Sequence, residues 1–144
     1  MTLKTRPLKQ STTHVSGFTL IELLISVVII GLITSIAIPS YTKLQTSAKE
    51  NIVKTITHSL QMSIETYNLS IGEHPPSQTI DELIRLLQEK DCYSDIPKNP
   101  FTREPYSQND PSGKITYIYN ETTESYKLTG YGKKNTAILL TLEN

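Results

Sequence analysis

The stretch that decides the fold is residues 18–38, which read FTLIELLISVVIIGLITSIAI. These 21 residues contain a single charged side chain, Glu22. At about 1.5 Å per residue they make roughly 30 Å of helix, which matches the thickness of a bilayer core. The sequence therefore predicts a membrane-spanning helix over residues 18–38.

The charges before this span predict its orientation. Residues 1–17 contain Lys4, Arg6 and Lys9 and no acidic residue. Basic residues beside a span are preferentially retained in the cytoplasm. We therefore expect a single-pass protein of the cytoplasmic membrane, whose short N-terminus stays inside and whose chain after Pro39 lies outside the cytoplasm.

The composition excludes several classes of function. The chain has 14 basic and 14 acidic residues, and this neutral balance gives no electrostatic reason to expect a nucleic-acid partner. A single cysteine cannot form an internal disulfide, and three scattered histidines do not indicate a metal centre. Because the sequence also has no nucleophile–base arrangement and no cofactor motif, we expect that the chain is not an enzyme.

Glu22 is the residue that an ordinary membrane anchor does not explain. A carboxylate inside an apolar span is unfavourable by a few kcal/mol at the centre and by less near the interface. Because Glu22 lies only five residues into the span, one interpretation is a tolerated boundary charge. The other is a buried cationic partner. The span contains no Lys or Arg, so that partner would come from another chain or from a newly made N-terminus.

The run Gly-Phe-Thr-Leu-Ile-Glu-Leu-Leu at residues 17–24 resembles the processing motif of type IV pilins and type II secretion pseudopilins. A short basic leader precedes the motif, and an uninterrupted apolar span follows it. The resemblance implies that a prepilin peptidase cleaves after Gly17 and removes the leader, residues 1–17. It also implies that Phe18 is then N-methylated as the new N-terminus.

The residue types of the motif suit that chemistry. Gly17 has no side chain, so the scissile bond can enter a protease cleft in an extended conformation. The new amine of Phe18 is mostly protonated near neutral pH, and methylation keeps its charge. Glu22 can pair with the Phe18 amine of a neighbouring subunit in an apolar filament core, where the pair specifies axial register more than it adds stability.

Two other residues of this region are candidates for a role in assembly. Gly31 is one of several small residues that permit close approach of a second helix. Pro39 removes a backbone donor. In the resembled family a proline at this place loosens the helix during assembly, and the alternative is a simple kink at the bilayer surface.

Beyond Pro39 the apolar pattern predicts an amphipathic stem helix over residues 39–70, which continues the membrane helix. Apolar residues recur at spacings of three and four. They are Tyr41, Leu44, Ala48, Ile52, Val53, Ile56, Leu60, Ile64 and Tyr67. A stripe of this kind needs a partner, and we expect the C-terminal part of the chain to cover it.

Residues 71–144 predict a small globular part. The Thr-x-x-Glu pattern at residues 79–82 indicates a capping box at the start of a short helix. Its expected buried residues are Leu83, Leu86 and Leu87. Apolar or alternating runs predict three antiparallel strands near residues 115–119, 126–129 and 137–142. The expected fold is therefore α+β, a long helix packed against a small β-meander, as in pilins.

No metal or cofactor is expected. The resembled family often binds calcium in its late loops, and the oxygen donors available here are Asn109, Asp110, Asn120, Glu121 and Glu124. Lys133 and Lys134 lie where that family often has acidic ligands, which does not favour calcium. His58 reads as a surface or boundary residue, and Cys92 as a free thiol or an inter-subunit link.

The resemblance implies a structural subunit of a homo-oligomeric filament. Such subunits wait in the inner membrane after processing, and a platform protein with a cytoplasmic ATPase adds them to a periplasmic or surface filament. The short globular part and the proline-rich loop at residues 97–106 favour a major pseudopilin that drives protein export. A type IV pilin for adhesion, twitching or DNA uptake is the alternative. Two remote alternatives are a plain anchored domain and a domain secreted by cleavage after Ser35-Ile36-Ala37.

Overall fold

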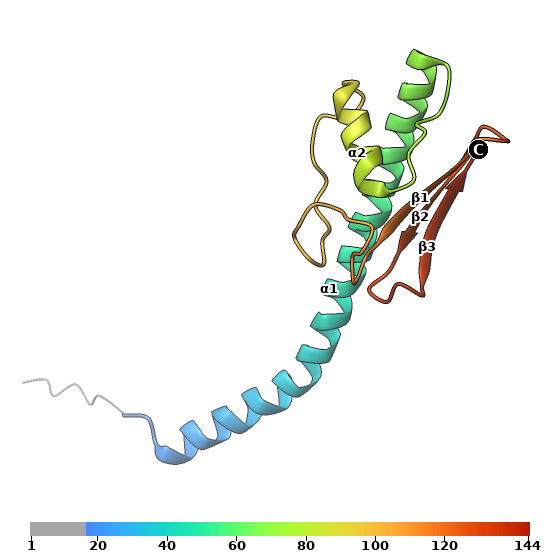
Figure 1. Cartoon of the computed structure of the whole chain (residues 1–144). Helices are drawn as coiled ribbons and strands as arrows, with labels where there is room; N and C mark the ends of the chain where they lie inside the picture. The colour runs from blue at the N-terminus through green and yellow to red at the C-terminus, as the bar shows by residue number, and fades with distance from the viewer. Residues whose placement is uncertain (1–16) are drawn as a thin grey trace, which may run out of the picture. The chain divides into compact units, whose positions relative to one another are not determined.

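The computed structural model of this chain describes residues 17–144, so the expected leader lies outside the described residues apart from Gly17. Two helices and a three-stranded sheet make up this part of the chain (Figure 1). In chain order the elements are α1 (Leu20–Ile71), α2 (Ile80–Glu89), β1 (Ile115–Asn120), β2 (Ser125–Tyr131) and β3 (Ile138–Glu143). The chain divides into two compact units, and we call the second, Ser40–Asn144, the head unit.

The sheet has the expected meander topology. Its strand order is β1-β2-β3, and both neighbouring pairs are antiparallel. Tyr117 lies opposite Leu128, and Leu128 lies opposite Leu142. Directly opposed residues point to the same side of a sheet, so these side chains share one apolar face. Together with the long helix, this sheet confirms the α+β fold class.

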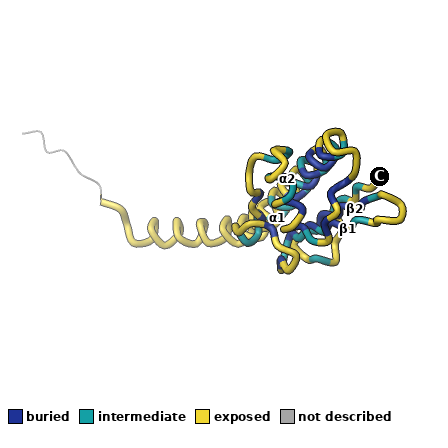
Figure 2. Tube along the Cα trace, turned by 45° about the horizontal axis from the view of Figure 1, so that its top comes forward, coloured by how far each residue is buried: buried dark blue, intermediate teal, exposed yellow. Residues whose placement is uncertain are grey.

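The part of α1 inside the head unit forms the other side of the core. Figure 2 shows the buried residues gathered where the helices and the sheet meet. On α1 the buried apolar residues are Val53, Leu60, Ile64 and Tyr67. The backbone of β2 comes close to this helix at Gly130, where an added Cβ would lie 2.7 Å from Thr57 Oγ1. Only a residue without a side chain fits that approach.

The expectation that the sheet covers the whole apolar stripe of α1 is wrong for its first half. Tyr41 is 66% exposed and Leu44 is 69% exposed. The sheet meets the helix later, where the Glu50 carboxylate accepts a hydrogen bond of 3.1 Å from the backbone N–H of Lys133 in the β2–β3 loop. The turns of α1 before that contact therefore keep their apolar side chains on the surface of the head unit.

α2 begins at the expected capping box. The N–H of Glu82 donates to Thr79 Oγ1 at 3.3 Å, and the Glu82 carboxylate accepts from the Gln78 N–H at 3.4 Å. The buried residues of α2 are Ile80, Leu83, Ile84 and Leu87. Leu86, which we expected on the buried face, is only half-buried. The reason is that the buried stripe follows the i, i+3, i+4, i+7 spacing from Ile80, and position 86 is off that stripe.

The proline-rich loop after α2 is organised around Asn99, which is fully buried. Its side-chain Nδ2 donates to the Ser112 carbonyl at 2.8 Å, and its Oδ1 accepts from the Phe101 N–H at 2.9 Å. Its backbone N–H donates to the Glu104 carbonyl, and its own carbonyl accepts from the Arg103 N–H. These four hydrogen bonds let a segment without helix or strand pack into the core.

Candidate functional site at the start of α1

Thr19 and Glu22 form a hydrogen-bonded cap at the start of α1. Thr19 precedes the first helical residue, and its carbonyl accepts the Leu23 N–H at 3.2 Å. The Glu22 N–H donates to Thr19 Oγ1 at 3.3 Å. In return, Glu22 Oε2 accepts from the Thr19 N–H at 2.9 Å and from the Thr19 hydroxyl at 2.7 Å. This reciprocal arrangement is a capping box, which pairs backbone donors that a helix start leaves unsatisfied.

The cap gives the Glu22 carboxylate local partners that we did not expect. Both hydrogen bonds from Thr19 end on the same oxygen, Oε2. An ionised carboxylate offers about four acceptor positions on its two oxygens. The arrangement therefore orients the charge and still leaves acceptor positions for a cation.

The sequence contains a signal for this cap that our prediction for Glu22 did not use. Thr-x-x-Glu at residues 19–22 is the same pattern that predicted the start of α2 at residues 79–82. At the second site the pattern precedes an amphipathic run, whereas at the first it lies within a continuous apolar stretch. Our prediction for Glu22 therefore rested on its charge and gave it a distant cationic partner.

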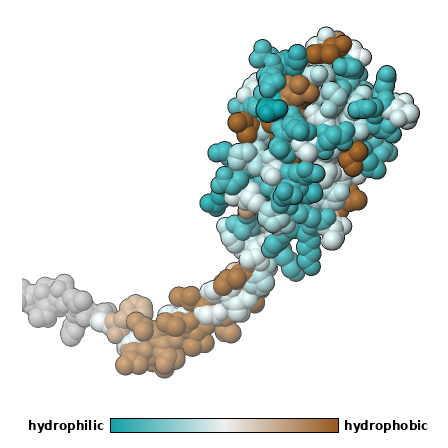
Figure 3. Space-filling view, in the orientation of Figure 1, coloured by the Kyte–Doolittle hydropathy of each residue, from teal (hydrophilic) through white to brown (hydrophobic). Residues whose placement is uncertain are grey.

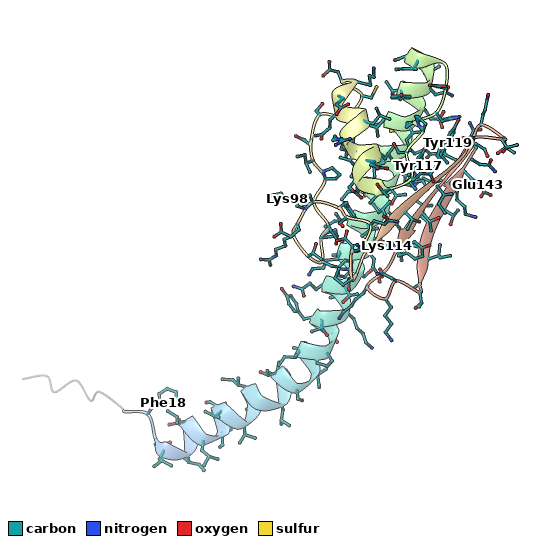
Figure 4. All side chains as sticks on the ribbon, viewed as in Figure 1. Phe18, Lys98, Lys114, Tyr117, Tyr119 and Glu143 are labelled. Atoms are coloured by element: carbon teal, nitrogen blue, oxygen red, sulfur yellow. The ribbon has the colours of Figure 1, made fainter. Side chains whose placement is uncertain are left out.

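Phe18 lies just outside the helix (Figure 4), and Gly17 precedes it in the chain. Both are exposed, and the exposed fraction of Phe18 is 80%. Among the described residues, apart from its two chain neighbours, no atom lies within 4 Å of the place where a Gly17 Cβ would stand. The bond between these two residues is therefore open to an enzyme that approaches it.

The apolar residues that follow are exposed along the helix. Within the described residues, α1 contains one stretch long and apolar enough to cross a membrane, and none of that stretch is buried in the protein. Figure 3 shows this stretch as a continuous hydrophobic surface. The hydroxyls of Ser26, Thr34 and Ser35 each donate to a carbonyl of the same helix. Because its polar side chains are satisfied internally, the segment suits a lipid environment.

Gly31 and Pro39 both lie within α1. Nothing lies within 4 Å of the place where a Gly31 Cβ would stand, so the surface at this position is open. Pro39 is inside the helix and is the last residue of the first compact unit. A proline has no N–H to donate to the carbonyl four residues earlier, so the helix has one fewer backbone hydrogen bond at this point.

The remaining candidate residues do not come together as a site. Within residues 17–144, no group of three or more His, Cys, Asp or Glu side chains could hold a metal ion. The carboxylate of buried Asp110 accepts the Ser107 N–H at 3.2 Å, which is a local turn contact. His58 is exposed, and Cys92 is a half-buried free cysteine. The expectation that no cofactor binds stays a prediction.

Comparison with known proteins points to the same end of the chain. Residues 13–38 match the family model described as the prokaryotic N-terminal methylation motif. This is the prepilin-type signal of type IV pilins and pseudopilins, and it supports a pilin-like precursor that prepilin peptidase processes. With the apolar helix, it fits a single-pass inner-membrane protein and indicates a structural subunit. No curated protein and no solved structure matches the chain.

Proposed function

We propose that the chain is the precursor of a subunit of a type IV pilus-like filament and has no catalytic activity of its own. The observation that carries the proposal is the methylation motif, whose Gly17–Phe18 bond is exposed immediately before an exposed apolar helix. Prepilin peptidase cleaves after Gly17 and methylates the new amine of Phe18. The mature chain then begins one residue before the cap at Thr19.

The span of α1 serves two environments in turn. Lipid surrounds it before assembly, and the same segments of other copies surround it in the filament. Both environments accept a helix whose hydroxyls bond to its own carbonyls, and a glycine such as Gly31 permits close helix packing. The missing hydrogen bond at Pro39 makes that position an easy place for the helix to bend when the subunit leaves the bilayer.

Glu22 receives the Phe18 amine of a neighbouring copy. Its Oε2 is held by the N–H and the hydroxyl of Thr19, so the carboxylate is oriented before the amine arrives. An unpaired charge in an apolar core is strongly unfavourable. A copy whose amine is displaced along the filament axis leaves the charges unpaired, so it does not assemble. The pair therefore specifies the axial register of the filament.

Within this class we assign the chain to the major pseudopilins, whose filament extension exports folded proteins in type II secretion. The support is the short head unit, its proline-rich loop around Asn99, and a single cysteine, which cannot form the disulfide-closed loop of many adhesive pilins. A platform protein and a cytoplasmic ATPase add each subunit at the base. Deletion in the host separates this assignment from a pilin role, because loss of surface motility or adhesion with normal secretion would favour a pilin.

Intact-mass and N-terminal analysis of the protein from its own host tests the processing step. We expect a chain that begins at Phe18 and is heavier by one methyl group. Gly17→Val should leave the chain uncleaved, whereas the matched glycine variant Gly31→Val should still be cleaved. A wild-type chain that begins at Ile38, or one that retains Met1, would contradict the proposal.

Substitution of Glu22 tests the pairing step separately. Glu22→Gln keeps the shape of the side chain and its capacity to accept hydrogen bonds from Thr19, but it removes the charge. We expect normal cleavage and membrane insertion with strongly reduced filament formation. Thr19→Val is the matched control, because it removes the hydroxyl of the cap and keeps the charge. If Glu22→Gln assembled as well as Thr19→Val, charge pairing would not be the basis of assembly.

A further inference from the structure

One end of the head unit gathers basic side chains. Lys43 lies on α1 shortly after Pro39, and Lys133 and Lys134 lie in the loop between β2 and β3. A surface hollow of about 350 Å³ brings the helix and this loop together. Its lining residues are Thr42, Lys43, Thr46, Ser47, Glu50 and Lys133. Two ammonium groups and several hydroxyls therefore border a single depression.

These lysines are not neutralised within the head unit. Among residues 17–144, no carboxylate oxygen lies within the ion-pair distance of 4.0 Å from the ammonium groups of Lys43, Lys133 or Lys134. The one acid that lines the hollow, Glu50, accepts the backbone N–H of Lys133 and keeps its negative charge, so the lining with its two lysines stays net positive. The head unit as a whole has 11 basic and 13 acidic residues, so its net charge is slightly negative. The lysines at this end therefore form a positive region in a unit of the opposite net charge.

Apolar side chains accompany these charges. Tyr41 and Leu44 lie within one turn of Lys43 on α1 but on other sides of the helix, and they are 66% and 69% exposed. Tyrosine is enriched at membrane–water interfaces, and lysine stems lie along apolar surface while the ammonium group reaches the headgroups. A tyrosine and a leucine exposed on the same helical turn as an unpaired lysine suit a helix that leaves the bilayer through its interface.

We propose that the basic end of the head unit (Lys43, Lys133 and Lys134) docks on anionic phospholipid headgroups of the membrane that holds the span. The proposal rests on the proposed function, since it needs residues 18–38 to lie in a bilayer. Lys43 follows Ile38 by five residues, which is at most about 18 Å of chain, so the covalent connection keeps it close to the headgroups when the span is inserted.

The shared hollow extends this contact to the loop. Lys133 borders the same depression as Lys43, so a headgroup that reaches one lysine is also near the other. A lipid phosphate supplies the negative charge and the acceptor oxygens that the two ammonium groups beside the hollow can bind. The head unit is thereby held on the membrane surface before assembly and released when the subunit is extracted.

Acylation of lysines in the full-length chain tests this proposal. The chain is placed in nanodiscs of phosphatidylcholine alone or of phosphatidylcholine mixed with phosphatidylglycerol, and co-elution first establishes insertion. Mass spectrometry then gives the rate at which an amine-reactive reagent modifies each lysine. We expect the anionic discs to slow modification of Lys43, Lys133 and Lys134 by about fivefold each, because a lysine gains that factor in partitioning near an anionic surface. High salt should remove the effect. Lys98, an exposed lysine of the proline-rich loop, should not change.

Paired variants test whether the hollow acts as a unit. Lys133→Gln combined with Lys134→Gln should reduce the protection of Lys43 in anionic discs, whereas Lys98→Gln should leave it unchanged. Equal rates in the two kinds of disc would overturn the proposal. So would protection by inorganic phosphate added to phosphatidylcholine discs, which would indicate a free-anion site, or protection that follows the number of chains per disc, which would indicate a second copy.

The two proposals fail in distinguishable ways. A chain that inserts into both kinds of disc without lipid-dependent protection overturns the docking surface and leaves the filament subunit intact. A chain that enters neither kind of disc contradicts both proposals. Normal cleavage after Gly17 in the host, measured separately, bears only on the proposed function.

Discussion

Gly130 is a demanding position in the packing between the sheet and α1, and Gly130→Ala tests that packing. An added Cβ would lie 2.7 Å from Thr57 Oγ1 and 3.4 Å from Val53 Cγ1. Non-bonded heavy atoms are comfortable at about 3.5–4.0 Å, so Thr57 has to move. It is fully buried, and its hydroxyl donates to the Val53 carbonyl at 2.8 Å, so it cannot rotate away without losing that bond.

The expected cost follows from these contacts. Overpacking of a well-packed core costs about 1–3 kcal/mol. Loss of the Thr57 hydrogen bond would add about 1 kcal/mol. We therefore expect Gly130→Ala to lower the free energy of unfolding of the head unit by about 2–4 kcal/mol, which is a large part of the roughly 5–15 kcal/mol typical of a domain.

Urea unfolding of the full-length chain in detergent micelles provides the assay. The chain has 8 tyrosines and no tryptophan, and every tyrosine lies in the head unit, so tyrosine fluorescence reports on this unit. Thr57→Ala removes the oxygen that the new methyl group would meet. In that background Gly130→Ala should cost less than about 0.5 kcal/mol, since the two sites are in contact and their effects are not additive. Gly31→Ala is the matched glycine control and should not change the signal.

Two results would refute this reasoning. The first is a Gly130→Ala chain that unfolds at the wild-type urea concentration. The second is a cost that is the same with and without the Thr57 hydroxyl. Either result would mean that β2 does not approach α1 through this glycine.

Three other outcomes are expected from the same urea assay. Thr79→Ala should destabilise the head unit by about 1 kcal/mol through loss of the α2 cap, whereas an unchanged midpoint would show that the cap contributes nothing. Tyr126→Phe should cost about 1.5–3 kcal/mol, because it removes the 2.6 Å hydrogen bond to the Glu65 carboxylate, and Glu65→Gln should recover part of that cost. Burial raises the pKa of Tyr117 and of Tyr126 above the ordinary 10.0, so the unfolded chain loses these protons first. The contribution of these two tyrosines to stability should therefore be constant below about pH 10 and fall above it, by up to about 1.4 kcal/mol per pH unit for each tyrosine. A slope that Tyr126→Phe leaves unchanged would contradict this origin.

Local patterns predicted the elements of this fold well. Alternating residues located β1 and β2, and Thr79 marked the start of α2, because each signal depends only on neighbours along the chain. The extent to which the sheet covers α1 depends instead on where the β2–β3 loop reaches the helix, at Glu50. No local pattern contains that information, so the exposure of Tyr41 and Leu44 could not be predicted.

The candidate site likewise has features that a local sequence pattern indicates and features that only the fold reveals. The segment from Gly17 to Glu22 is a linear motif, so the sequence alone indicated its processing. The cap between Thr19 and Glu22 was also readable in principle, because its four-residue pattern is local. Lys43 and Lys133 border one hollow although they are ninety positions apart in the sequence. Only the folded head unit brings them together.

Hydrogen bonds of Asn99 hold the proline-rich loop in a defined turn, although the loop contains no helix and no strand. The backbone of Asn99 closes the turn through the Arg103 N–H and the Glu104 carbonyl, and its side-chain amide connects the turn to Ser112. The number of residues in the turn is therefore set by these hydrogen bonds and not by the distance that the loop has to bridge. One residue inserted between Asn99 and Glu104 would open the turn and leave the buried side-chain amide of Asn99 without hydrogen-bond partners. A protease should find this segment as hard to enter as a strand of the sheet.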